Sequence, residues 1–126
     1  MGLADSRPVA KRRQRRERES SATVEYTDPE GNVLTLREQL SARTIRKVGP
    51  PPTGSGAAVE DAWHRRIEML FEYLAVGWEI AGLPLDDQKM LLGRYRMADA
   101  GTQRWVRRTI AQHLERHIPE LAEPSR

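Results

Sequence analysis

The chain has 126 residues, a net charge of +3 and no cysteine. This length leaves room for one small domain, and the lack of cysteine excludes disulfide bridges and thiolate metal sites. No apolar run approaches the ~20 residues that a membrane-spanning helix needs, so we expect a cytoplasmic protein without membrane contacts.

The N-terminal segment, residues 1–21, is rich in arginine and contains the run "KRRQRRERES". The first twenty residues hold seven basic and three acidic side chains, a charge of +4, so the rest of the chain sums to −1. Such a polar segment buries too little apolar surface to fold alone, and we predict a disordered arm. The run is similar to the arginine-rich arms with which phage antitermination proteins grip an RNA hairpin, and a solubilising tail without a partner is the alternative. The candidate nucleic-acid contacts in it are Lys11, Arg12, Arg13, Arg15, Arg16 and Arg18.

Residues 22–48 are predicted to form a β-hairpin followed by a helix. The stretch "TVEYTDPEGNVLTL" places β-favouring residues on both sides of a turn with Pro29 and Gly31, which predicts strands over 23–27 and 32–34. Thr35 and Glu38 have the spacing of a capping box, so we expect the second strand to pass directly into a helix.

A Pro/Gly linker over residues 49–58 precedes the strongest helical pattern. Apolar residues recur every three or four positions from Trp63 to Ala81, which predicts one continuous central helix. A second apolar stripe lies beside this face and is a candidate partner groove. Its members are Met69, Tyr73, Val76 and Ile80.

Two further helices are predicted after the "AGLPLDD" break, with Pro84 near the start of the first and Asp99 or Thr102 capping the second. In the last helix, Val106, Ile110 and His117 share the inward face with Leu114. The three-helix body then covers residues 59–118, and residues 119–126 form a frayed tail. The predicted fold class is mainly α, with a short N-terminal β-hairpin and about four helices in a small bundle.

The titratable residues do not form a recognisable catalytic or metal-binding pattern. His113 and His117 are four residues apart on one helix, but the third candidate ligand, His64, belongs to another helix. Asp86 and Asp87 are adjacent, so they suit a helix start better than a facing acid/base pair. We therefore expect no enzymatic activity, no cofactor and no metal.

A second candidate nucleic-acid surface lies on the last helix, where Trp105 is surrounded by Arg104, Arg107 and Arg108. An aromatic ring among arginines can stack on a base while the cations contact phosphates. The patch would support the N-terminal arm.

Two longer stretches, "YTDPEGNVLTLREQLSARTIRKV" and "LFEYLAVGWEIAGLPLDDQ", resemble small tail-assembly proteins of phages and prophages of actinobacterial hosts. The matching residues of the first are Thr35, Leu36, Arg37 and Leu40; those of the second are Tyr73, Leu74, Trp78, Gly82 and Pro84. The resemblance implies a non-catalytic chaperone or adaptor that holds apolar segments of tail proteins until they assemble. The alternative is a small nucleic-acid-binding protein that uses the arginine-rich arm.

Overall fold

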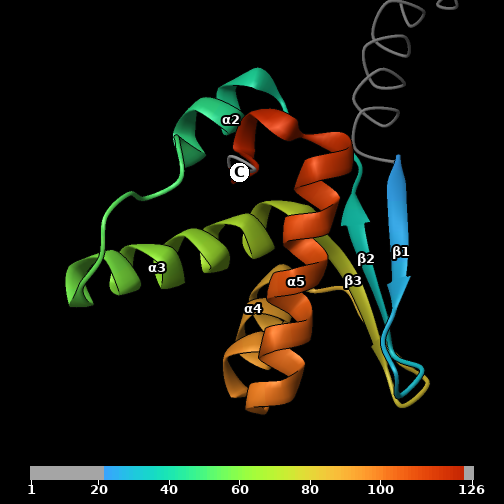
Figure 1. The fold of residues 1–126 in the computed structure, drawn as a ribbon. Coiled ribbons are helices and arrows are strands. Elements are labelled where there is room, and N and C mark those ends of the chain that lie inside the picture. The colour runs from blue at the N-terminus through green and yellow to red at the C-terminus, as the bar shows by residue number, and fades with distance from the viewer. Residues whose placement is uncertain (1–21, 124–126) are drawn as a thin grey trace, which may run out of the picture.

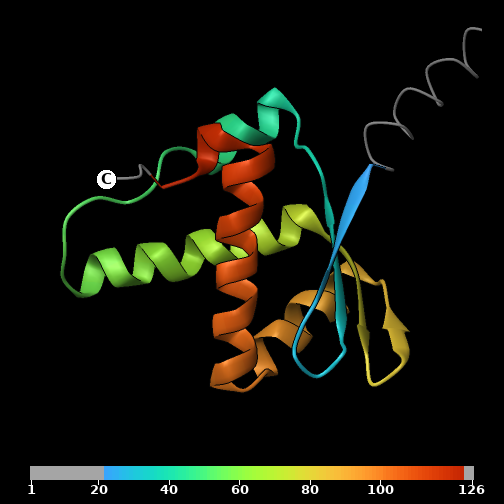
Figure 2. The same cartoon turned by 45° about the vertical axis from the view of Figure 1, so that its right-hand side comes forward.

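The computed structural model describes residues 22–123, and the predicted arginine-rich arm lies outside them. These residues form two layers, a four-stranded antiparallel sheet with helices packed on one of its faces (Figures 1 and 2). The elements in chain order are β1 (Thr23–Thr27), β2 (Val33–Arg37), α2 (Ala42–Val48), α3 (Ala57–Leu74), β3 (Ala75–Ile80), β4 (Leu83–Leu85), α4 (Gln88–Met97), α5 (Ala100–His117) and the short 3-10 helix η1 (Pro119–Leu121).

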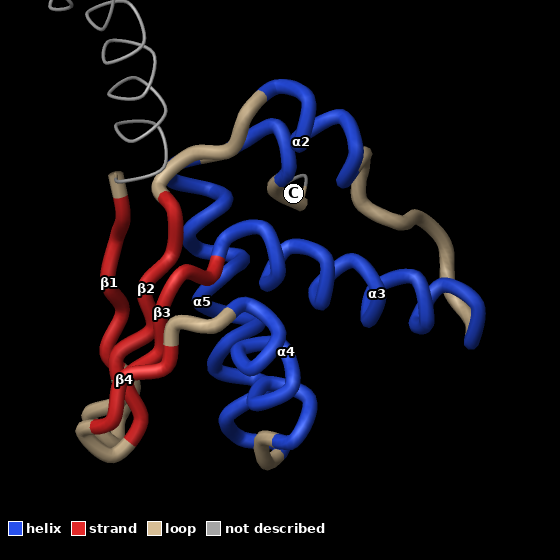
Figure 3. Tube along the Cα trace, turned by 180° about the vertical axis from the view of Figure 1, so that it is seen from behind, coloured by secondary structure: helices blue, strands red, loops and turns tan. Residues whose placement is uncertain are grey.

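The prediction of a helical bundle with only an N-terminal hairpin is wrong. The strands lie in the order β1-β2-β3-β4, so the hairpin is the first half of a larger sheet. Figure 3 shows the strands along one side of the molecule and the helices on the other. No helix among the described residues is both long and apolar enough to cross a membrane.

The first hairpin forms around the predicted turn, where the Asp28 carboxylate accepts hydrogen bonds from the backbone N–H groups of Glu30 and Asn32. Gly31 takes a φ of +86°, which a residue with a side chain rarely adopts. Strand β2 continues to Arg37, beyond the predicted end, because its side chains alternate between the core and the outer face.

The predicted capping box at Thr35 and Glu38 does not start a helix. Thr35 pairs with Glu25 in the sheet, and the next helix begins only at Ala42. Its cap is Ser41, whose hydroxyl accepts a hydrogen bond from the Thr44 N–H at 3.1 Å. Sheet pairing of the buried Leu34 and Leu36 side chains outweighs the local capping signal in this stretch.

The predicted central helix is also too long. Helix α3 ends at Leu74, and the chain passes without a loop into β3, which occupies the centre of the sheet beside β2. Residues 75–80, "AVGWEI", fit a helical spacing, yet they include the β-branched Val76 and Ile80 and the helix-disfavouring Gly77. Pairing with β2 and β4 satisfies their backbone groups in the extended form.

Strands β3 and β4 are joined by a tight turn in which Ala81 and Gly82 have φ values of +52° and +79°. The Ala81 N–H donates to the Asn32 side-chain oxygen at 3.0 Å, so the two hairpin turns are tied together. Pro84 lies in β4 rather than in the next helix. This position suits proline because β4 is an edge strand and one side of it needs no hydrogen-bond donor.

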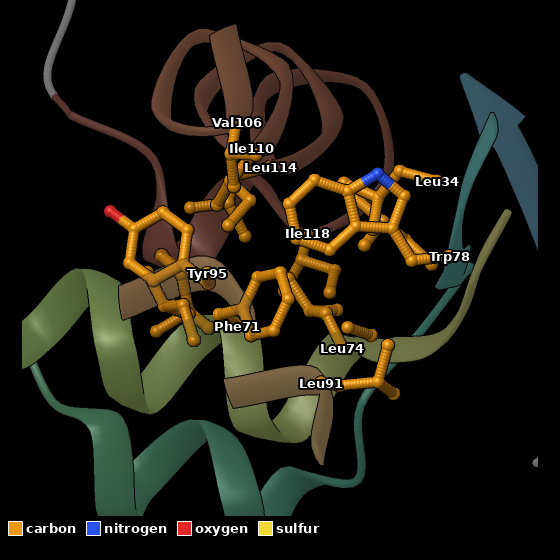
Figure 4. Packing of buried hydrophobic residues seen from close by; sticks show 14 residues of the cluster. Leu34, Phe71, Leu74, Trp78, Leu91, Tyr95, Val106, Ile110, Leu114 and Ile118 are labelled. Atoms are coloured by element: carbon orange, nitrogen blue, oxygen red, sulfur yellow. The ribbon is translucent and has the colours of Figure 1, made fainter. Parts of the chain in front are cut away.

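The core lies between the sheet and helices α3, α4 and α5 (Figure 4). At its centre the Phe71 ring stacks on Tyr95 with 5.1 Å between ring centroids and meets the edge of Trp78 at 5.9 Å. Leu34 and Leu36 supply the contribution of β2 and are fully buried. Burial of these apolar side chains is the main force that holds the two layers together.

The last two helices form where the sequence predicts them. Asp99 is the cap of α5, and its carboxylate accepts from the Thr102 N–H at 2.7 Å. The expected inward residues Val106 and Ile110 are buried, but the fully buried histidine is His113 rather than His117.

Candidate functional site: a basic-edged apolar groove

An apolar groove lies between α3, α5 and η1, with a volume of about 430 Å³. This volume falls within the ~300–1,000 Å³ of typical ligand sites. Its lining residues are Glu60, Trp63, His64, Arg66, Ile67, Leu70, Arg107, Arg108, Ile110, Ala111, Leu114, Leu121 and Glu123.

The groove exists because α3 and α5 cross over the core instead of running side by side (Figure 2). Leu70 and Ile110 belong to the core and form part of the groove's floor. Trp63 and Ile67, earlier on α3, are only half-buried and form part of the wall. On α5 the corresponding position is Ala111, which is exposed and too small to fill the space. The site therefore offers apolar surface that the described residues leave open to solvent.

Arg66 is the most unusual lining residue, because it is a charged side chain with only 6% of its surface exposed. Its guanidinium donates to the carbonyl oxygens of Gly49 and Leu121, each at 2.7 Å. Gly49 ends α2 and Leu121 ends η1, so one side chain ties both elements to α3. Burial lowers the pKa of Arg66 from its ordinary value, and the carboxylate of Glu123 acts in the opposite direction.

The remaining cations of the groove come from α5. Arg108 is exposed and Arg107 is half-buried, and the guanidinium of Arg107 acts electrostatically on the hydroxyl of Tyr95. Burial raises the pKa of Tyr95, while Arg107 opposes this shift, so the hydroxyl stays protonated near neutral pH.

The predicted aromatic and basic patch on α5 is divided between two surfaces. Trp105 is half-buried in a second groove of about 450 Å³, which the hairpin turn forms with the start of α5. Asp28, Glu30 and Asp99 line that groove together with Trp105. The three carboxylates beside the Trp105 ring repel phosphate groups, so this groove is an unfavourable place for the ring to stack on a nucleic-acid base. The other members separate as well: Arg104 is exposed outside both grooves, Arg107 faces the first groove and Arg108 lines both.

The four residues of the predicted partner stripe do not lie on one helix. Met69 and Tyr73 belong to α3, whereas Val76 and Ile80 belong to β3. Met69 is 38% exposed and the other three are half-buried. The stripe is lost because its helical spacing is interrupted at Leu74.

The buried histidine of the predicted pair on α5 is hydrogen-bonded to two strands of the sheet. His113 is fully buried, with Nδ1 at 2.7 Å from the Tyr26 hydroxyl and Nε2 at 2.8 Å from the Arg37 carbonyl oxygen. A carbonyl can only accept, so Nε2 carries the proton and Nδ1 accepts from Tyr26. This network fastens α5 to β1 and β2. Within residues 22–123, no three His, Asp or Glu side chains gather where they could hold a metal ion.

Sequence reasoning missed the groove because it assigned Trp63 and Ile67 to the core and did not consider Arg66. One signal was available: Arg66 lies three residues after Trp63 and four before Leu70, which places a cation on the apolar face of α3. An arginine at such a position needs hydrogen-bond partners from other elements.

Comparisons of the chain with protein-family models, with curated proteins and with solved structures each return no match.

Proposed function

We propose that this chain is a non-catalytic binding protein that holds an amphipathic helical segment of a partner protein in the groove between α3 and α5. The observation that carries the proposal is the open apolar wall of the groove, formed by Trp63, Ile67 and Ala111. A helix docks into such a groove by inserting side chains spaced three and four residues apart. Water leaves the wall and the inserted side chains together, which drives association.

The cellular role that fits this activity is that of a tail-assembly chaperone or adaptor of a phage or prophage, acting in the cytoplasm of the bacterial host. The partner segments would come from tail proteins that expose apolar helices before they assemble. The resemblance of residues 26–48 and 70–88 to tail-assembly proteins supports this role, and the groove offers a surface that suits it. Holding a segment requires no catalytic group.

The test uses peptides that tile tail-tube and tape-measure proteins of actinobacterial phages and prophages, with binding to the full chain followed by fluorescence anisotropy. We expect at least one apolar helical peptide to bind. Ala111→Tyr adds a ring to the groove wall, so it should weaken that binding at least about tenfold, which corresponds to ~1.4 kcal/mol. Gln112→Tyr is the matched control, because Gln112 is an exposed neighbour on α5 that does not line the groove.

Two results would refute the proposal. One is that no tail-protein peptide binds, and the other is that a peptide binds equally well to the Ala111→Tyr variant. Salt-sensitive binding of an RNA hairpin in place of peptides would move the function to the predicted arm, residues 1–21.

A further inference from the structure

The arginines of the groove have no acidic partners among the described residues. In that part of the chain the ion pairs within 4.0 Å are Arg96 with Glu68 at 2.6 Å and His117 with Glu38 at 3.6 Å. Neither pair includes Arg66, Arg107 or Arg108. The groove thus presents three guanidinium groups whose charge is not neutralised by a described carboxylate in contact.

The positive charge of the groove has its strongest effect at Arg66, because this side chain is buried. Its two hydrogen-bond acceptors are backbone carbonyls, which are dipoles without net charge. The Glu123 carboxylate acts on Arg66 electrostatically from beyond 4.0 Å, so no described carboxylate is in direct contact with this buried cation, and its field is weakly screened because solvent is largely excluded. The groove beside it is therefore a favourable place for a negative charge.

The acidic residues of the groove offset its positive charge only in part. Glu60 stands in the first turn of α3 and Glu123 follows η1, and neither lies within 4.0 Å of a groove arginine, although Glu123 acts on Arg66 at longer range. Counting the three arginines against these two glutamates leaves a charge of +1. A basic occupant would be repelled. This disfavours the chain's own first twenty residues, which hold seven basic and three acidic side chains.

We propose that the segment bound in the groove is acidic: it carries an Asp or Glu beside its apolar anchor residues, and Arg107 and Arg108 pair with that carboxylate at the edge of the groove. The apolar wall binds the anchors, and the arginines select the charge and the direction of the helix. Arg66 adds a favourable field without moving, because it remains bonded to Gly49 and Leu121. This inference rests on the proposed function and adds the chemical class of the partner.

The experiment selects partners from a displayed library of amphipathic helical peptides about 15 residues long. Their apolar face is fixed as leucine, and the flanking positions are varied among Glu, Gln and Lys. The target is the full chain. Glu should be enriched over Lys at one or more flanking positions of the peptides that bind. Replacing that Glu by Gln should then weaken binding about tenfold, or ~1.4 kcal/mol.

A double-mutant cycle locates the pairing. The Arg107→Gln/Arg108→Gln variant should bind the Glu and Gln peptides with nearly equal affinity, whereas Arg104→Gln should keep the tenfold difference. Arg104 is the control because it is an exposed arginine of α5 outside the groove. The peptide change leaves the protein intact, so the comparison of Glu with Gln stands even if the double variant is less stable.

The outcomes separate the two proposals. If the selected peptides bind the Ala111→Tyr variant as tightly as the original chain, the groove is not the binding site and the proposed function fails. If binding is sensitive to Ala111→Tyr but Glu is not enriched, or its replacement by Gln has no effect, the groove holds helices and the acidic partner is refuted.

Discussion

Replacing the buried Arg66 by methionine tests whether one side chain holds α2 and η1 on the rest of the fold. Helix α2 has no buried residue of its own. Ile45 and Val48 pack against the core only half-buried, the hydrogen bond from Arg66 to the Gly49 carbonyl adds to the attachment of α2, and η1 receives the second bond at Leu121. Methionine keeps much of the length and removes both donors.

The magnitude follows from these two bonds. A hydrogen bond from a charged donor contributes roughly 1.5–3 kcal/mol, so two contribute about 3–6 kcal/mol. Methionine is apolar, so the variant recovers part of the cost of burying a guanidinium. We expect the free energy of unfolding to fall by about 2–4 kcal/mol. Arg65→Met is the matched control, since Arg65 is the exposed neighbour and its replacement should change stability by less than ~0.5 kcal/mol.

Urea unfolding of both variants measures the loss, and amide hydrogen exchange localises it. In the Arg66→Met variant, protection should decrease first over residues 42–48 and 119–122, while the sheet keeps its protection. A variant as stable as the original chain, or one whose protection falls evenly over all elements, would show that Arg66 does not anchor these two helices.

Three further predictions concern single contacts of the fold. The buried indole N–H of Trp78 has no hydrogen-bond partner within residues 22–123, so Trp78→Phe should cost less than about 1.5 kcal/mol in urea unfolding, whereas Trp78→Ala should cost ~3–5 kcal/mol. Burial lowers the pKa of His113, so the unfolded chain takes up a proton at higher pH than the native chain does. The free energy of unfolding should therefore fall as the pH drops below ~6.5. His113→Gln should flatten this dependence when unfolding is measured from pH ~7.5 to ~5. Hydrogen bonds from Thr102 lower the pKa of Asp99, and Asp99→Ala should lower stability near neutral pH, with the difference from the original chain shrinking as acid protonates the cap. An unchanged pH profile in His113→Gln or a fully tolerated Trp78→Ala would contradict these assignments.

The first hairpin turn and the last two helices could be predicted from the sequence because their signals are local. The Asp28 to Asn32 turn, the Asp99 cap and the apolar spacing of α5 depend on residues within a few positions of one another. Nothing far away along the chain competes with them, so local chemistry and the final structure agree.

The sheet could not be predicted because its central pairing joins distant segments. Thr35 and Gly77 are partners across β2 and β3, although 42 positions separate them in the sequence. In isolation, Thr35 has the spacing of a helix cap and residues 75–80 continue a helical pattern. Each segment becomes a strand because the other offers backbone partners, and a single sequence contains no direct record of that pairing.

The groove could not be predicted from the sequence for a related reason. An apolar residue on a helix face shows that the face is buried by something, but periodicity does not say whether the cover comes from the same chain. Trp63 and Ile67 continue the pattern of the core residue Leu70, yet α5 crosses α3 at a point that leaves them half-covered.

The proline-rich connection between α2 and α3 has an anchored first residue and an exposed middle. Thr53, Gly54 and Ser55 are exposed and lie outside the helices, while the Gly49 carbonyl before them is held by Arg66. The free energy of unfolding depends only on the logarithm of the loop length, and each doubling of a loop lowers it by about 0.6 kcal/mol. A reporter domain or an affinity tag inserted at Gly54 would therefore leave the sheet, the core and the groove in place. This connection gives the protein a natural position at which to carry a label or an additional module.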